Sequence, residues 1–270
     1  MKKTGHLHKL RNKLASPIQY FLPLDDDEVP LNELIGQKIT LEFSGEIHCQ
    51  HCAKLTKKSY SQGYCFVCMR RLPQCDMCIM KPETCHFHLG TCRDSEWGKK
   101  NCFKDHTVYL ANTSGVKVGI TRDIPTRWID QGATQALAIF RVKNRLLSGL
   151  IETTFKQHIA DKTDWRKMLK GNAEPVALDE HRDMLFDLNK DAIVAIIAEH
   201  GKDSVEVLDE KILELDFPVE VFPEKIKSFN FDKTPSISAT LLGIKGQYLI
   251  FDTGVLNIRK FTSYLISFAY

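Results

Sequence analysis

Nine cysteines lie within one fifth of the 270-residue chain, and their spacing is the strongest chemical signal in the sequence. They are Cys49, Cys52, Cys65, Cys68, Cys75, Cys78, Cys85, Cys92 and Cys102. Three Cys-x-x-Cys pairs occur in a chain whose basic N-terminus shows no apolar export segment, so a disulfide framework is the weaker explanation. Such crowding predicts thiolate ligation of a metal ion.

The first four cysteines form the pattern Cys49-x2-Cys52-x12-Cys65-x2-Cys68, which is typical of a zinc ribbon. Each Cys-x-x-Cys knuckle presents two sulfur atoms to one tetrahedral ion. Zinc suits four thiolates best, and a closed four-sulfur site leaves no open position for chemistry, so we expect a structural ion here. Iron in the same site and a set of buried free thiols are the alternatives.

A second group of candidate ligands follows the first. We expect a second zinc site formed by Cys75, Cys78, Cys85 and Cys92. Cys102 and His86 are the substitutes, because the five thiols and three imidazoles of this stretch exceed what one ion takes. The alternative is a single zinc ion, with the remaining cysteines serving the fold. The sequence therefore predicts one or two structural zinc ions.

Charge is distributed unevenly along the chain, although the net charge is only +3. Residues 49–104 carry 10 Lys and Arg against 4 Asp and Glu, residues 105–171 carry 11 against 6, and residues 172–270 carry 10 against 17. The basic centre predicts a nucleic-acid partner, DNA or RNA, because clustered cations release counterions from phosphates. We expect the contacts to include Arg93, Lys99, Lys100 and Arg122. A solvated basic surface is the alternative interpretation.

Composition excludes several classes of protein. With 43% hydrophobic and 26% charged residues the chain is neither disordered nor of low complexity. The longest strictly apolar run, residues 192–198, is far shorter than the roughly 18 residues that span a bilayer. We therefore expect a soluble, cytoplasmic protein that has no membrane partner.

Downstream of the cysteines the hydrophobic pattern predicts an ordered set of elements. They are strands at residues 108–111, 116–121 and 137–142, a short helix after Pro125 and a helix from Arg145 to about Ala160. The first two strands form a hairpin that places Tyr109 beside Lys117 and the bare backbone of Gly119. Apolar residues at every fourth position define the last helix, and Glu152 lies at the edge of that stripe.

In the last third of the chain the sequence predicts secondary structure and says little about chemistry. The expected elements are a helix at residues 179–200, strands at residues 237–242, 247–251 and 255–258, and a final strand that closes at Tyr270. These strands predict a small antiparallel sheet or barrel, which Leu41 and Phe43 near the N-terminus would complete.

Together the patterns predict an α+β protein of five parts. These are an N-terminal segment with a β-strand (residues 1–48), a zinc-ribbon-like cysteine-rich module (49–105), a β-β-α-β-α domain (106–171), a helical connector (172–210) and a C-terminal β domain (211–270).

Residues 106–170 resemble the GIY-YIG endonuclease superfamily. Val108-Tyr109-Leu110 stands where that family has its first motif, and Lys117-Val118-Gly119 stands at the second. Arg127 lies eight residues past Gly119, as in the excision-repair nuclease branch, and Glu152 lies on a following helix. The whole chain is also similar to an uncharacterised bacterial family described as a domain of unknown function.

The superfamily resemblance implies roles for these residues. Tyr109 would help to activate the attacking water, Arg127 would neutralise the scissile phosphate, and Glu152 would hold one Mg or Mn ion. Gly119 is the glycine of the second motif. The sequence departs from the family pattern at Lys117, which replaces a tyrosine. Lys117 would contact phosphate, or would act as the base if its ammonium group is desolvated.

Three functions follow from these patterns. The first is a zinc-containing, nucleic-acid-binding protein that cleaves phosphodiester bonds as a divalent-metal-dependent endonuclease. The second is a catalytically inactive DNA- or RNA-binding module on the same scaffold. The third is a structural zinc assembly protein, which the basic centre of the chain disfavours.

Overall fold

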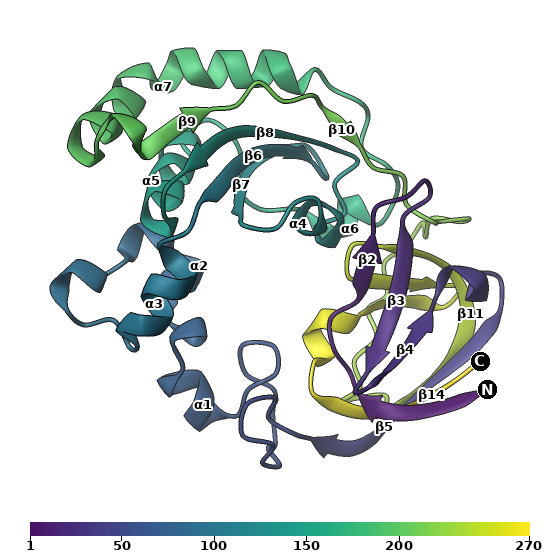
Figure 1. Cartoon of the computed structure of the whole chain (residues 1–270). Coiled ribbons are helices and arrows are strands. Elements are labelled where there is room, and N and C mark those ends of the chain that lie inside the picture. Colours follow the sequence, from purple (N-terminus) through teal and green to yellow (C-terminus); the bar gives the residue numbers. More distant parts are fainter.

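The first and last strands of the chain pair with each other in the computed structural model, which describes residues 1–270. Strand β1 (Lys2–His6) runs antiparallel to β14 (Tyr264–Ala269), so the two termini lie side by side, as Figure 1 shows. Both belong to a six-stranded sheet in the order β1-β14-β5-β11-β12-β13. The other four strands are β5 (Lys38–Ile47), β11 (Ser236–Lys245), β12 (Tyr248–Phe251) and β13 (Gly254–Asn257).

The expected pairing between the N-terminal strand and the C-terminal strands is confirmed. In β5, Leu41 lies opposite Ile237 of β11 and pairs on its other side with Phe268 of β14. The N-terminal segment contains more than the one expected strand, because a second sheet, β2-β3-β4, is also built from it. Its strands are β2 (Arg11–Lys13), β3 (Gln19–Leu24) and β4 (Asp27–Pro30). Alternate residues of β3 are buried in the same core as the six-stranded sheet, so the two sheets form one β lobe, comprising β1–β5 and β11–β14.

A third sheet, in the order β10-β8-β6-β7 with β9 paired to β8, forms the central lobe. Its strands are β6 (His106–Asn112), β7 (Val116–Thr121), β8 (Gln135–Val142), β9 (Val205–Val207) and β10 (Leu213–Glu214). Its helices are α4 (Thr126–Asp130), α5 (Arg145–Phe155), α6 (Trp165–Met168) and α7 (Leu178–His200). The apolar faces of α5 and α7 cover one face of the sheet and enclose a separate buried core. The expected order of strand, strand, helix, strand and helix is confirmed for β6, β7, α4, β8 and α5.

Helix α5 ends at Phe155, five residues before the expected end. The residues after it turn toward β7, where the Val118 N–H donates to the Ala160 carbonyl at 2.9 Å. Backbone pairing with an open edge strand thus replaces the last helical turn, because it satisfies polar groups that β7 would otherwise leave unpaired. The same turn brings Asp161 next to Lys117.

The boundary between the helical connector and the C-terminal β domain does not lie at residue 211, where the sequence predicts it. Both β9 and β10 add to β8, so residues 205–214 extend the central sheet rather than beginning the C-terminal one. The apolar run at residues 192–198 lies in α7, which packs against α5 and β8. None of the helices is both long and apolar enough to cross a membrane.

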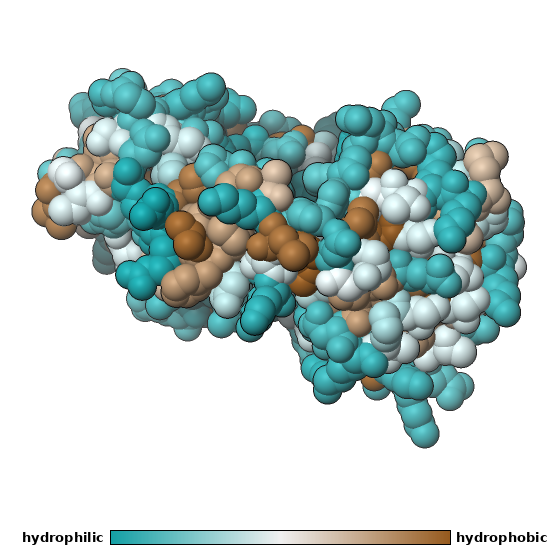
Figure 2. Space-filling view, turned by 90° about the horizontal axis from the view of Figure 1, so that it is seen from below, coloured by the Kyte–Doolittle hydropathy of each residue, from teal (hydrophilic) through white to brown (hydrophobic).

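The cysteine-rich module, residues 48–105, connects β5 of the β lobe to β6 of the central lobe (Figure 1). It contains only short helices, α1 (Phe66–Arg71), α2 (Met77–Met80) and α3 (Ser95–Cys102). None of its residues belongs to any of the three buried hydrophobic cores. The surface view in Figure 2 accordingly shows two masses joined at a narrow waist. A module without an apolar core needs another source of stability, and a metal ion can supply it.

Candidate functional site

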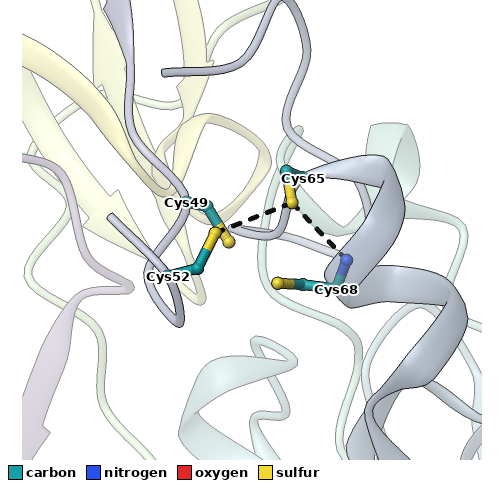
Figure 3. A group of neighbouring side chains, drawn as sticks. All are labelled: Cys49, Cys52, Cys65 and Cys68. Atoms are coloured by element: carbon teal, nitrogen blue, oxygen red, sulfur yellow. Dashed lines mark hydrogen bonds between the residues drawn. The ribbon is translucent and has the colours of Figure 1, made fainter. Parts of the chain in front are cut away.

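Four cysteines of the module converge on one point. Cys49 and Cys52 lie in the loop after β5, whereas Cys65 caps the N-terminus of α1 and Cys68 lies within that helix (Figure 3). All four sulfur atoms lie within 4.8 Å of one another, and the Sγ atoms of Cys52 and Cys65 are 3.9 Å apart. Zinc–sulfur bonds of about 2.3 Å in a tetrahedron place sulfur atoms roughly 3.8 Å apart. The group can therefore hold a zinc ion, as the spacing predicts.

The backbone around this group stabilises one thiolate before any ion binds. Burial opposes ionisation of Cys49, but the backbone N–H groups of Cys52, Cys65 and His51 outweigh it and lower the pKa of Cys49 to about 6. The pKa of Cys68 is raised, first by burial and then by the neighbouring thiols. The backbone thus favours the thiolate of Cys49, whereas ionisation of Cys68 needs a bound cation beside it.

The structure distributes the remaining five cysteines differently from the expected second site. Cys78, Cys85, Cys92 and Cys102 line one small cavity. Cys75 lies outside it and faces a separate cavity that includes Lys9 and Arg259 of the β lobe. Of the expected ligands, Cys75 is therefore the one that the fold does not bring to the others.

The four basic residues expected to contact nucleic acid differ in their surroundings. Arg93 pairs with the Asp76 carboxylate at 2.8 Å and donates to two carbonyls of the module, so it holds the module together. Lys99 pairs with Glu96 at 2.8 Å, and Arg122 donates to the Asn101 carbonyl at 2.7 Å. Lys100 is exposed. Arg93 is the least available of the four for a phosphate.

Tyr109 occupies the middle of β6, directly opposite Gly119 of β7. A Cβ atom at position 119 would lie 2.6 Å from the Tyr109 hydroxyl oxygen, so the tyrosine ring fills the space that a side chain would take. The hydroxyl donates to Gln131 Oε1 at 3.1 Å, and the residue is completely buried. Burial raises the pKa of Tyr109, and the neighbouring Arg127 guanidinium opposes that shift. Gly119 is thus required for Tyr109 to reach α4.

Lys117 and Glu152 lie in the same neighbourhood. Lys117 is 5% exposed, and burial, followed by the charge of Arg127, lowers its pKa to about 8. Burial raises the pKa of Glu152, the carboxylates of Asp161 and Glu83 add to the shift, and Lys156 and Lys117 oppose it. The charge of Arg127 therefore acts on both Tyr109 and Lys117, and Lys117 and Glu152 act on each other. These four residues come from β6, β7, α4 and α5.

Glu83, which the sequence did not single out, also affects Glu152. Glu83, from the cysteine-rich module, has one buried carboxylate oxygen without a hydrogen-bond partner, and its charge reaches Glu152. Glu83 therefore adds a second negative charge that acts on Glu152. No sequence signal marks Glu83, because the packing of its 3₁₀ turn, Pro82–Thr84, against α5 brings it there.

The β lobe supplies a further cation. Arg259 lines a cavity of about 540 Å³ between the β lobe and the module, and its Nε donates to Gln62 Oε1 at 2.6 Å. Burial lowers the pKa of Arg259, and the charge of Arg127 lowers it further. The Asp130 carboxylate opposes that shift, so the charges of Arg127, Asp130 and Arg259 act on one another across the two lobes.

Comparison with known proteins gives one match. Residues 36–266 match the family described as Protein of unknown function (DUF2797). The chain belongs to the DUF2797 family. No curated protein and no solved structure matches it. The residues that the DUF2797 match covers include all nine cysteines, Tyr109, Lys117, Arg127 and Glu152, whereas β1–β4 lie before it.

Proposed function

We propose that this DUF2797 protein binds nucleic acid and hydrolyses its phosphodiester bonds, as a divalent-metal-dependent endonuclease related to the GIY-YIG superfamily. The observation that carries the proposal is that Tyr109, Lys117, Arg127 and Glu152, from four separate elements, influence one another's pKa values. Phosphodiester hydrolysis needs a base, a cation beside the phosphate and a carboxylate that can hold a metal ion. The cluster contains each of these groups.

Arg127 is the phosphate-binding group of the proposed site. Its guanidinium is half-buried on α4, and a planar fork of donors suits a phosphate better than a lysine does. As negative charge builds up on the phosphate oxygens, a fixed guanidinium stabilises the transition state. Arg259 of the β lobe, whose pKa the charge of Arg127 lowers, would contact a neighbouring phosphate of the same strand.

Tyr109 acts as a positioning residue in this proposal. Because it is completely buried and donates to Gln131, it holds α4 and the Arg127 side chain in place rather than touching the attacking water. The residue that can take a proton is Lys117, whose pKa of about 8 leaves a useful neutral fraction near physiological pH. The substitution of Lys117 for the family's tyrosine thus moves the base from a phenol to an amine.

Glu152 would hold the divalent ion, with Glu83 as a second carboxylate. When bound there, Mg or Mn would supply positive charge beside the leaving oxygen. A structural zinc ion at Cys49, Cys52, Cys65 and Cys68 would fix the module that connects the two lobes.

The second candidate is a nucleic-acid-binding module without activity, on the same scaffold. The burial of both candidate bases favours it, since Tyr109 is completely buried and Lys117 is only 5% exposed, and a base that cannot reach solvent cannot activate a water. The two candidates share the phosphate contacts and differ only in chemistry.

The test is to incubate the zinc-loaded full chain with labelled single-stranded DNA, duplex DNA and RNA, with Mg, Mn or EDTA. The endonuclease proposal expects metal-dependent products from at least one substrate. Both candidates expect binding that weakens with salt, with a log–log slope of about −3 or steeper if four or more phosphates are contacted. Binding without products in either metal would support the inactive module, and no binding at low salt would exclude both.

A further inference from the structure

We propose that Cys78, Cys85, Cys92 and Cys102 hold a second zinc ion, and that Cys75 remains a free thiol. This ligand set differs from the one that the spacing of the Cys-x-x-Cys pair favours, and it is independent of the proposed nuclease activity. It places the second ion beside α5 rather than between the lobes.

The first support is the cavity that these four cysteines share. Its volume is about 20 Å³, and the rest of its wall includes the apolar side chains of Ile79, Phe87, Trp97 and Phe103. A space of this size accepts one water molecule or one ion. Cys75 does not line it.

The second support is the placement of the four sulfurs along the chain. Cys78 lies in α2, Cys85 follows the 3₁₀ turn Pro82–Thr84, and Cys102 ends α3. A Cβ atom at Gly98 of α3 would lie 3.3 Å from the Cys92 sulfur, so this sulfur packs against the backbone at Gly98. Gly98 lies one helical turn before Cys102. Residues four apart share a helix face, which puts Cys92 and Cys102 on the same side of α3.

These sulfurs are more widely spaced than the four of the first group, since no three of them lie within 4.8 Å of one another. Binding of one ion would therefore require the four sulfur atoms to move closer to one another. The segments between successive ligands are only six, six and nine residues long, so closing them costs little chain entropy.

The third support is a buried cation without a partner charge. Arg145, the first residue of α5, is half-buried, forms no ion pair, and has an Nε atom that is buried without a hydrogen-bond partner. One of its terminal nitrogens donates to the Ile79 carbonyl at 2.5 Å, which places the guanidinium beside α2. Zinc bound to four thiolates carries a net charge of −2, so it would supply a negative partner for the Arg145 guanidinium.

A competing set of donors lies close by. Asp76, Cys78 and His86 place three ligand atoms within 4.8 Å of one another. Asp76 and His86 line the same cavity as the four cysteines. The Asp76 carboxylate, however, already pairs with Arg93 at 2.8 Å, whereas the four thiols form no ion pair, so the thiols are the freer ligands.

The proposed ion also bears on the candidate active site. Arg145 begins the helix that carries Glu152, and a Cβ atom at Gly149 of that helix would lie 2.5 Å from the backbone of Glu83. The four-thiol site thus clamps the module onto α5 and fixes both carboxylates near each other.

Zinc content of full-length variants tests the ligand set. The wild-type chain and Cys75→Ser should each retain two zinc ions per chain after desalting, whereas Cys102→Ser should retain one. The reverse pattern, with one ion in Cys75→Ser and two in Cys102→Ser, would overturn the proposal. So would loss of one ion from His86→Ala together with full zinc content in Cys102→Ser.

A second measurement on the wild-type chain remains informative even if Cys102→Ser fails to fold. Alkylation of the native, zinc-loaded protein followed by peptide mass spectrometry should modify Cys75 first, and should modify Cys102 only after chelation. Rapid alkylation of Cys102 in the presence of zinc, with Cys75 protected, would contradict the assignment.

Discussion

Burial of the Lys117 ammonium in the central lobe lowers its pKa to about 8, which turns an ordinary lysine into a group that can accept a proton near neutral pH. If Lys117 is the base, cleavage requires its neutral form. The rate should then rise about tenfold per pH unit below pH 8 and level off above it. Initial rates between pH 6 and pH 9 at fixed metal concentration measure this profile.

Lys117→Met provides the matched control at the same position. In the folded chain the pKa of Lys117 is lower than the 10.5 of the unfolded chain, so the unfolded state binds the proton more readily. The charged lysine therefore destabilises the fold increasingly as the pH falls from 10.5 to about 8, and by a constant amount below that. Lys117→Met should therefore lose cleavage while melting at an equal or higher temperature at pH 7. A wild-type rate that does not depend on pH in this range would remove Lys117 from the chemistry.

At the scale of elements, the hairpin of β6 and β7 depends on Gly119. Gly119→Ala would place a Cβ atom 2.6 Å from the Tyr109 hydroxyl, and the ring has the buried core around it. Overpacking of this kind should destabilise the chain by about 1–3 kcal/mol and displace Arg127 from its place on α4. Thermal denaturation measures the loss.

Gly171→Ala is the control for that change, because nothing lies within 4 Å of a Cβ atom at position 171. It should melt close to the wild-type temperature. Equal melting temperatures for Gly119→Ala and Gly171→Ala would show that Tyr109 does not fill the space above Gly119.

Elements whose sequence pattern depends only on residues near one another in the chain were predicted correctly. The alternation in β6 and β7, the four-residue repeat in α5 and the two knuckles around Cys49 and Cys65 each depend on neighbours in the sequence. The end of α5 and the pairing of β9 and β10 with β8 were missed, because strand edges elsewhere in the fold decide them. The second ligand group was ambiguous for the same reason, since only packing separates Cys75 from Cys102.

At the scale of the whole molecule, Asp130 holds the two lobes together. Its carboxylate, 5% exposed, accepts from Lys9 at 3.2 Å, from Asn12 at 2.9 Å and from Gln247 at 2.8 Å, all residues of the β lobe or its edges. No periodicity or spacing could have indicated this contact. The contact bears on the proposed function because Asp130 lies on the same short helix as Arg127.

Asp130→Ala should destabilise the chain by about 2–4 kcal/mol, because it leaves buried donors from the β lobe without an acceptor. Chemical denaturation should show the loss, and hydrogen exchange should show faster opening of α4 and β2. Asp123→Ala, at an exposed position just before α4, serves as the control and should be near neutral. A similar small effect for both variants would mean that the lobes are held together elsewhere.

Cleavage of one labelled strand by four forms of the chain tests most directly whether Arg127 and Glu152 form one active site. The forms are wild type, Arg127→Ala, Glu152→Gln and the double variant, with zinc content and strand binding measured on each. We expect each single substitution to reduce the cleavage rate about 100-fold or more. Zinc content should stay unchanged, and the double variant should lose little beyond the worse single one, since groups that act together are not additive. Wild-type protein that cleaves no substrate with Mg or Mn, or single variants that cleave as fast as the exposed control Glu199→Gln, would contradict the endonuclease assignment.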